Sequence, residues 1–206
     1  NFETNDIQID EDCFSRGQLR SKLWLVDELK KCNVELGKVF LCAGWYATLA
    51  TMLFESDIKI DFIRSFDVDP DVWKIAEVFN KPWVADNWKF KASTEDIHEI
   101  RFDEHIYDVN KTDGTTQRLW TTPDTVINTS CEHITQEQYD QWLDNQPDNA
   151  LFVIQSNNYF ELDEHIRCST DLDDFVHMSN INSYLRKTLE TPKYERYMII
   201  GKKKNV

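Results

Sequence analysis

Short apolar runs alternate along the chain with segments in which apolar residues recur every three or four positions. Over residues 15–32, leucines at nearly helical spacing lie between a serine start and a lysine-rich end, which predicts an amphipathic helix. The apolar run at 38–44 then predicts a buried strand, and the segment 45–56 returns to helical spacing. A strand followed by a helix is therefore the first unit of the predicted fold.

This strand and helix unit repeats toward the C-terminus. Further strands are predicted at 61–69, 88–94, 124–130 and 150–157, and further helices at 70–80, 135–146 and, as one or two turns, 172–178. Asp69 is the expected N-cap of the helix at 70–80, because its carboxylate can accept backbone hydrogen bonds and Pro70 suits the first helical position. Two extended runs on either side of Thr191 and Pro192 predict a terminal hairpin.

One segment departs from this alternation. Asp113 and Gly114 supply the conformations that a tight turn needs, which predicts a β-hairpin inserted at 100–122, outside the main sheet. Because the other strands alternate with helices, the sequence predicts an α/β fold with a doubly wound, mostly parallel sheet and an antiparallel last strand. No repeat or Pro/Gly/Ser-rich linker interrupts the chain, so we expect a single domain over 1–206, with an N-terminal helical extension at 1–34.

The composition restricts the environment and the classes of partner. Asp and Glu number 37 against 23 Lys and Arg, a net charge of -14, so the overall field disfavours binding to nucleic acid. No apolar run is long enough to span a membrane and no signal-peptide pattern occurs, so we expect a soluble, cytoplasmic protein without a membrane partner. The five cysteines are scattered, without a CxxC pair or a Cys/His cluster, which predicts reduced thiols and no metal site.

Two residues at strand ends point to a nucleoside ligand. In an open α/β sheet, ligands bind beyond the carboxyl ends of the strands. Gly44 follows the first strand and lets the backbone approach a ligand closely, while Asp67 ends the second strand and can accept two hydrogen bonds from a ribose diol. Together they indicate a cofactor that contains a nucleoside.

Five stretches of the chain carry a family resemblance. KVFLCAGWYATLA, FIRSFDVDP, KFKASTEDI, PDTVINTSCEHI and YERYMIIGKK resemble, in this order, the first four motifs and the antiparallel closing strand of class I S-adenosylmethionine-dependent methyltransferases. The resemblance covers about residues 35 to 205. It implies a Rossmann-like methyltransferase fold, S-adenosyl-L-methionine as cofactor, and direct displacement of its methyl group by a small or modest-sized acceptor.

The same resemblance implies roles for residues at the strand ends. The cofactor-binding residues that it implies are Cys42, Ala43, Gly44, Trp45, Tyr46, Asp67, Val68, Thr94, Asp96, Asn128, Thr129 and Ser130. Asp67 would bind the ribose, and Thr94 or Asp96 the exocyclic amine of the adenine. Glu132 or His133 would carry out any proton transfer, since methyl transfer otherwise depends on holding the acceptor in line with the methyl group.

Several alternatives stay open at this point. Glu132 and His133 can instead cap the following helix, and Trp45 and Tyr46 can be core residues at a helix start. Only Gly44 remains of the family's glycine-rich run, so a non-catalytic, methyltransferase-like binding or regulatory subunit is the main alternative function. A nicotinamide-dependent oxidoreductase is disfavoured because the chain has no GxGxxG run. Neither the acceptor nor the oligomeric state follows from the sequence.

Overall fold

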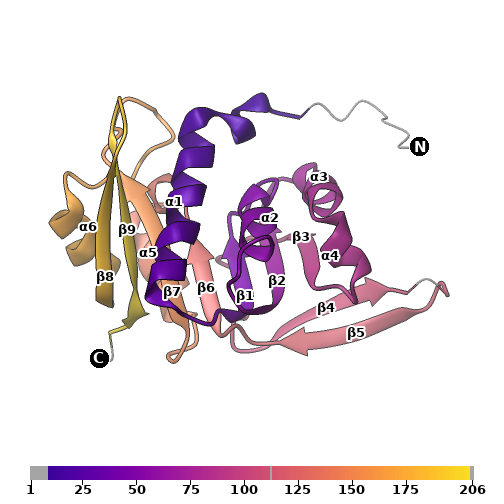
Figure 1. Cartoon of the computed structure of the whole chain (residues 1–206). Helices are drawn as coiled ribbons and strands as arrows, with labels where there is room; N and C mark the ends of the chain where they lie inside the picture. The colour runs from indigo at the N-terminus through magenta and orange to yellow at the C-terminus, as the bar shows by residue number, and fades with distance from the viewer. Residues whose placement is uncertain (1–8, 112, 205–206) are drawn as a thin grey trace.

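A computed structural model, which describes residues 9–111 and 113–204, has one mixed sheet at its centre (Figure 1). The strand order is β3-β2-β1-β6-β7-β9-β8. The strands are β1 (Gly37–Cys42), β2 (Ile60–Asp67), β3 (Phe90–Thr94), β6 (Thr125–Asn128), β7 (Leu151–Asn157), β8 (Ile181–Glu190) and β9 (Glu195–Lys203). Neighbouring strands from β3 to β7 run parallel, whereas β9 is antiparallel to both β7 and β8. The predicted sheet, including its antiparallel last strand, is confirmed.

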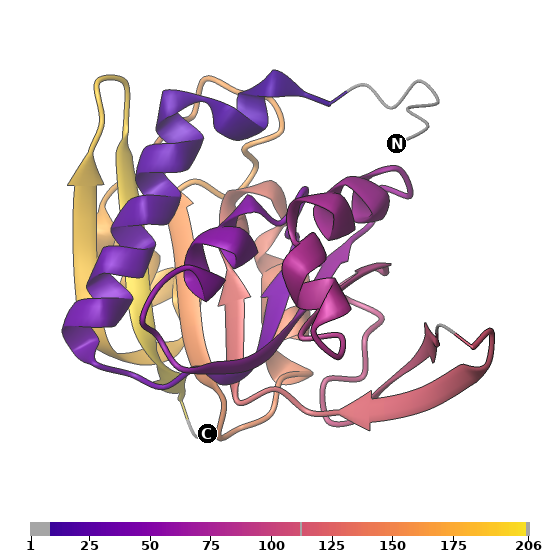
Figure 2. The ribbon, with the colours of Figure 1, turned by 45° about the vertical axis from the view of Figure 1, so that its right-hand side comes forward.

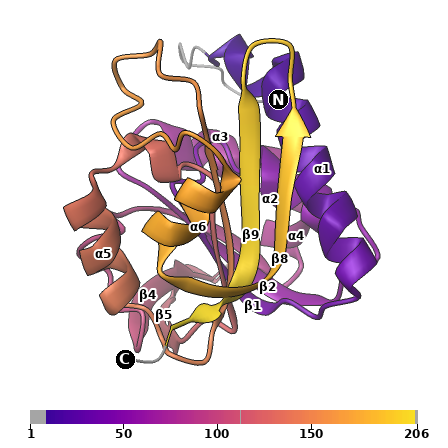
Figure 3. The same cartoon turned by 90° about the vertical axis from the view of Figure 1, so that its left-hand side faces the viewer.

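Helices cover both faces of this sheet (Figure 3). One face carries α1 (Arg16–Cys32), α2 (Thr48–Phe54), α3 (Val72–Phe79) and α4 (Lys81–Ala85), and the other carries α5 (Gln136–Asp144) and α6 (Leu172–Ser179). Alternate residues of β1 divide between the two cores: Val39 and Leu41 pack toward α1 and α2, and Phe40 packs toward α5 and α6. The sheet is therefore buried on both sides, as its continuous apolar strands predict.

A separate two-stranded hairpin lies beside the β3 edge of the main sheet (Figure 2). It consists of β4 (His105–Asn110) and β5 (Thr116–Thr121), and Gly114 at its turn has a φ of 82°. The buried side chain of Arg64 on β2 connects it to the main sheet, because Arg64 Nη2 donates to the Tyr107 hydroxyl at 2.8 Å. The predicted insertion is confirmed as a hairpin outside the main sheet.

Two helix starts differ from the prediction. Helix α2 begins at Thr48 rather than near residue 45, because Ala43, Trp45 and Ala47 have φ values of 49°, 48° and 50°, which a right-handed helix excludes. Asp69 is not the N-cap of α3, which begins at Val72; its Oδ1 instead accepts from the Asp71 N–H at 2.9 Å, in a turn that precedes the helix. The short helix α4 was not predicted.

Residues 1–8, which belong to the predicted N-terminal extension, lie outside the described residues. The rest of that extension forms the short 3-10 helix η1 (Glu11–Phe14) and α1, whose N-cap Ser15 accepts from the Gln18 N–H as its sequence predicts. No described helix has the length and apolar character that crossing a bilayer requires.

Candidate functional site

A cavity of about 430 Å³ opens at the carboxyl ends of β6 and β7. Residues from four segments line it: the start of α1, the residues after β6, the end of β7 with the loop that follows it, and the turn between β8 and β9 with the start of β9. Its walls include Arg16, Gln18, Thr129, Ser130, Glu132, His133, Asn157, Tyr159, His165, Tyr194 and Arg196. The cavity thus lies at the edge of the sheet where the strand-end rule places ligands.

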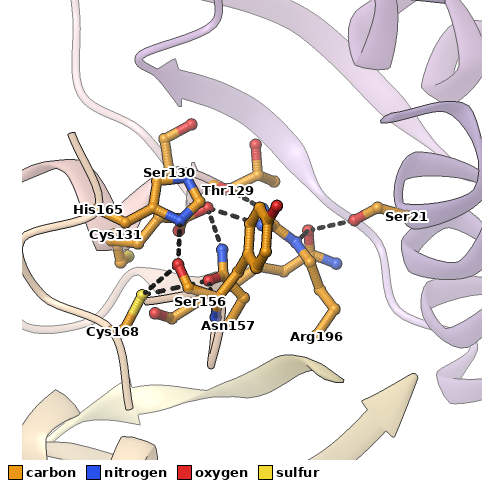
Figure 4. Close-up of polar contacts among 12 residues, drawn as sticks. Ser21, Thr129, Ser130, Cys131, Ser156, Asn157, His165, Cys168 and Arg196 are labelled. Carbon is orange, nitrogen blue, oxygen red and sulfur yellow. Dashed lines mark hydrogen bonds and ion pairs between the residues drawn. The ribbon is translucent and has the colours of Figure 1, made fainter. Parts of the chain in front are cut away.

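A buried ion pair holds the wall of this cavity together. Glu132 lies in η2 (Cys131–His133), just after β6, and its side chain is 3% exposed. Its Oε1 accepts from Arg196 Nη1 at 2.7 Å and from Asn157 Nδ2 at 2.8 Å. Asn157 and Arg196 are partners in the register of β7 and β9, and Arg196 also donates to the Thr129 carbonyl (Figure 4). One guanidinium therefore joins the ends of three strands.

Helix α1 is fixed to the same edge through Gln155. Ser21 Oγ donates to Gln155 Oε1 at 3.1 Å, and Arg196 Nε approaches the same oxygen at 3.4 Å (Figure 4). Both Ser21 and Gln155 are buried. The N-terminal half of α1 thereby covers the carboxyl ends of the strands and forms one side of the cavity.

The turn after β1 is hydrogen-bonded to the end of β2. The Gly44 N–H donates to the Phe66 carbonyl at 3.0 Å, and the Trp45 N–H donates to Asp67 Oδ2 at 2.8 Å. Asp67 Oδ1 accepts from the Asp69 N–H at 3.1 Å. A carboxylate offers about four lone-pair sites, so these two bonds leave Asp67 able to accept from a ligand as well.

The two aromatic residues of this turn pack on the helix side of it. The Trp45 and Tyr46 rings stack with centroids 4.9 Å apart, and Tyr46 is 6% exposed in a cluster with Cys13, Val72 and Ile75. The Tyr46 hydroxyl also accepts from the Asp10 N–H at 3.2 Å. Tyr46 therefore joins the N-terminal segment to α3, which is the core role that the sequence left open.

The other predicted cofactor residues divide into exposed and buried ones. Val68 is 65% exposed and Thr94 is exposed, both at strand ends, while the Asp96 carboxylate accepts from the His98 N–H. Cys42 points into the core on the α5 and α6 face, and burial raises the pKa of its thiol well above the ordinary value. Only the backbone of Cys42 is thus available to a ligand.

The end of β6 supplies the closest match between the predicted residues and the cavity. Asn128 is buried; its Oδ1 accepts from the Ser130 N–H at 2.9 Å, and its Nδ2 has no hydrogen-bond partner among the described residues. Thr129, Ser130 and the predicted proton-transfer residues Glu132 and His133 all line the cavity. The neighbouring Cys131 does not line it, since its side chain is fully buried. Burial also raises the pKa of Cys131 to about 12, which keeps it a thiol.

Sequence reasoning missed Arg196 and His165. Arg196 precedes the apolar run of the last strand, and that strand enters the site only because it is antiparallel. His165 lies in the loop between β7 and α6, where no periodic pattern indicates its neighbours. Only Arg196 could have been found from the sequence, because the charged pair at 195–196 directly precedes the apolar run of the last strand.

Replacing Lys22 with Met is expected to stabilise the protein. Burial of Lys22, in the first half of α1, is the main cause that lowers its pKa to about 8; Cys13 and Asp12 oppose this effect and Arg196 adds to it. The unfolded chain then binds more protons than the folded one between pH 8 and 10.5, so wild-type stability rises across that window. One pKa unit corresponds to about 1.4 kcal/mol, so the full shift would amount to about 3 kcal/mol. Because Lys22 is only partly buried and solvent screens its charge, we expect Lys22→Met to gain about 1–2 kcal/mol at pH 7.

Urea denaturation at several pH values measures this gain, which should shrink as the pH rises above 8. Lys30→Met, on the same helix, is the matched control, because its ion pair with Asp57 is exposed and contributes about 0–1 kcal/mol. A variant that is less stable than wild type at pH 7 contradicts the prediction.

Comparisons with known proteins relate this geometry to one fold. No protein-family model and no curated protein matches the chain. Its structure is similar to that of the N-methyltransferase NodS from Bradyrhizobium japonicum, with 10% identity, a TM-score of 0.60, and coverage of 96% of this chain and 100% of that one. It is also similar to the magnesium protoporphyrin IX methyltransferase ChlM from Synechocystis with bound SAM, with 13% identity, a TM-score of 0.59, and coverage of 99% and 86%.

A third similar structure is the 1,6-didemethyltoxoflavin-N1-methyltransferase from Burkholderia thailandensis, with 9% identity, a TM-score of 0.58, and coverage of 90% of this chain and 79% of that one. At these identities the similarity concerns the fold alone. The chain has the Rossmann-like fold of S-adenosylmethionine-dependent methyltransferases.

Proposed function

We propose that this protein is an S-adenosylmethionine-dependent methyltransferase that acts on a small or modest-sized acceptor by direct methyl displacement. The observation that carries the proposal is the Asp67 carboxylate, which ends β2 and is hydrogen-bonded to the backbone of the first β-to-α turn at Trp45. In this fold that position suits a ribose, because the acid lies beside the turn over which a nucleoside rests.

The residues around this turn fit the cofactor. Asp67 keeps lone pairs for the two ribose hydroxyls, and the exposed Val68 offers an apolar surface on which an adenine can lie. The unpaired amide nitrogen of Asn128 is a buried donor at the neighbouring strand end, where it can meet a carboxylate. We therefore assign the adenosine part to Asp67, Val68, Thr94 and Asp96, and the amino-acid part to Asn128, Thr129 and Ser130.

The bound cofactor supplies an electrophilic methyl group on a sulfonium. The chain's own contribution is to position the acceptor in the cavity and to manage its proton, which we assign to Glu132 and His133. Arg196 and Asn157 hold Glu132 Oε1, so the carboxylate is kept in one orientation.

The charges of the cavity favour an acceptor that carries a negative charge. Although the chain has a net charge of -14, the cavity wall contains Arg16, Arg20, Lys193 and Arg196 against the acids Asp12 and Glu132. A local excess of positive charge attracts anions even when the overall field does not. The structural neighbour solved with 1,6-didemethyltoxoflavin bound supports a small acceptor as well.

Asp67→Ala is expected to weaken binding of S-adenosylmethionine and S-adenosylhomocysteine by about 10- to 100-fold, since it removes hydrogen bonds to a charged group worth about 1.5–3 kcal/mol. Isothermal titration of both compounds measures the change. Asp71→Ala is the control, because Asp71 lies in the same exposed turn and its side chain makes no capping hydrogen bond to α3. Unchanged affinity in Asp67→Ala removes Asp67 from the site, and no binding by the wild type defeats the proposal.

One observation favours a second candidate function, a non-catalytic binding or regulatory subunit. Ala43, Trp45 and Ala47 keep the positive φ values that glycines adopt easily, but their side chains, with the Trp45 and Tyr46 stack, add bulk to the turn. This candidate predicts that the wild type produces no heat and no thermal shift with either compound. A ligand at a hundred times its dissociation constant should otherwise stabilise the fold by about 2.7 kcal/mol.

A further inference from the structure

Two histidines and one glutamate meet at the wall of the cavity. The ligand atoms of Glu132, His133 and His165 all lie within 4.8 Å of one another. They come from two segments, because Glu132 and His133 belong to η2 and His165 lies in the loop after β7. The two imidazole rings are 4.8 Å apart between centroids and nearly perpendicular, at 84°. Two imidazoles and a carboxylate are a common ligand set for divalent transition metals.

The hydrogen bond of His165 leaves the correct nitrogen for a metal. His165 Nδ1 lies 2.9 Å from the Tyr159 carbonyl oxygen (Figure 4). A carbonyl oxygen only accepts, so Nδ1 carries the proton and Nε2 of the neutral ring keeps its lone pair. Metal-ligating histidines are typically oriented in this way, with the second ring nitrogen donating to a backbone carbonyl or a carboxylate.

Glu132 supplies an oxygen that has no partner in the described part of the chain. Its side chain is only 3% exposed. Of its two oxygens, Oε1 is hydrogen-bonded, to Arg196 and Asn157. Oε2 is buried and unpaired. A buried polar atom without a partner destabilises the fold, and a cation at Oε2 removes that cost. Arg196 can remain on the other oxygen.

We propose that Glu132, His133 and His165 bind a divalent transition-metal ion such as zinc. With bonds of about 2.0–2.1 Å, ligand atoms in a tetrahedral site lie about 3.3 Å apart, so the present spacing of up to 4.8 Å must close slightly. His133 is exposed, and rotation of its side chain can supply that closure. All three residues line the cavity, which leaves the fourth coordination position facing it.

With the ion bound, Glu132 and His133 would be its ligands, and the ion would take over the proton-handling role assigned to them above. The open position would bind an oxygen of the acceptor and lower the pKa of its hydroxyl group, so that the proton leaves to water in the cavity before the oxygen takes the methyl group. This consequence rests on the proposed methyl transfer, whereas the metal binding itself does not. It differs from the expectation of no metal site, which rested on the scattered cysteines and on the absence of a Cys/His cluster at metal-ligand spacing.

Titration of the EDTA-treated full chain with Zn²⁺ in a calorimeter, and with Co²⁺ in a visible spectrometer, tests the proposal. We expect one ion per chain and a dissociation constant in the micromolar range or below. His133→Ala and His165→Ala should each weaken binding by at least tenfold, and Mg²⁺ should not compete, because it prefers an all-oxygen set. His177→Ala is the matched control, since His177 is exposed on α6 outside the cluster.

Absence of Zn²⁺ and Co²⁺ binding by the wild type overturns the proposal, and so does binding that both histidine variants retain, because the ion then lies elsewhere. His133→Ala keeps the test valid even when His165→Ala perturbs the loop, since His133 is exposed and its loss should leave the far-ultraviolet circular dichroism unchanged. Titration of the same variants with S-adenosylhomocysteine separates the two proposals, because cofactor affinity should persist when metal binding is lost.

Discussion

Arg196→Met is expected to destabilise the protein by about 3–5 kcal/mol, because removal of one partner leaves a buried charge without compensation. The Glu132 side chain is 3% exposed and that of Arg196 is 12% exposed, so water cannot replace the guanidinium easily. The substitution also removes the donor to the Thr129 carbonyl and separates the ends of β6, β7 and β9. Urea denaturation at pH 7 measures the loss, and calorimetry should show a correspondingly lower melting temperature.

An exposed ion pair of the same chemistry is the control for Arg196→Met. Arg118 pairs with Asp108 on the hairpin, and the side chains are 75% and 48% exposed, so Arg118→Met should change stability by less than about 1 kcal/mol. The double variant Glu132→Gln with Arg196→Met should be more stable than the sum of the single losses predicts, because no buried charge then remains. Equal losses from the exposed and the buried arginine would show that the buried pair has no special role.

The sequence predicted the sheet well because periodicity reports burial directly. The apolar run of β1 is buried on both faces, and α1 begins after the predicted serine, Ser15. Helix α5 begins within the predicted range, and its cap is Thr135 rather than Glu132 or His133. The helix starts after β1 and β2 were less accurate, since they depend on backbone conformations. An alanine at a φ of 50°, such as Ala47, is uncommon and its residue type does not predict it.

The sequence predicted the part of the candidate site that lies at the carboxyl ends of the parallel strands, where ligands bind in an open α/β sheet. Asn128 ends β6, Thr129 and Ser130 follow it, and the last two line the cavity at that edge. Arg196 and His165 were not predictable, because their position depends on the pairing of β9 with β7 and on the course of the loop at 158–171. Contacts between residues 64 positions apart, such as Glu132 with Arg196, leave no periodic trace in the sequence.

Gly44 has a different role in the structure from the one that the sequence indicates. The sequence suggests that this glycine lets a ligand approach the backbone closely, whereas the structure shows that it lets the turn pack against the sheet. A Cβ atom on Gly44 would lie 2.1 Å from Ser65 Oγ and 3.3 Å from Leu41 Cγ, so the missing side chain faces the sheet. Ser65 is buried on β2, and the Gly44 N–H is hydrogen-bonded to the next residue of that strand, Phe66. Packing of the turn against the sheet therefore requires a glycine at this position.

Gly44→Ala should accordingly destabilise the protein by about 1–3 kcal/mol, the range of overpacking in a tight core. Ser65→Ala removes the oxygen that the new methyl group meets, so the double variant should recover at least about 1 kcal/mol of that loss. Gly114→Ala is the control, because its Cβ would have no neighbour within 4 Å and only the positive φ opposes it. Urea denaturation measures all four proteins. If Gly44 serves ligand approach alone, Gly44→Ala will keep wild-type stability and lose only affinity for S-adenosylhomocysteine, and Ser65→Ala will restore nothing.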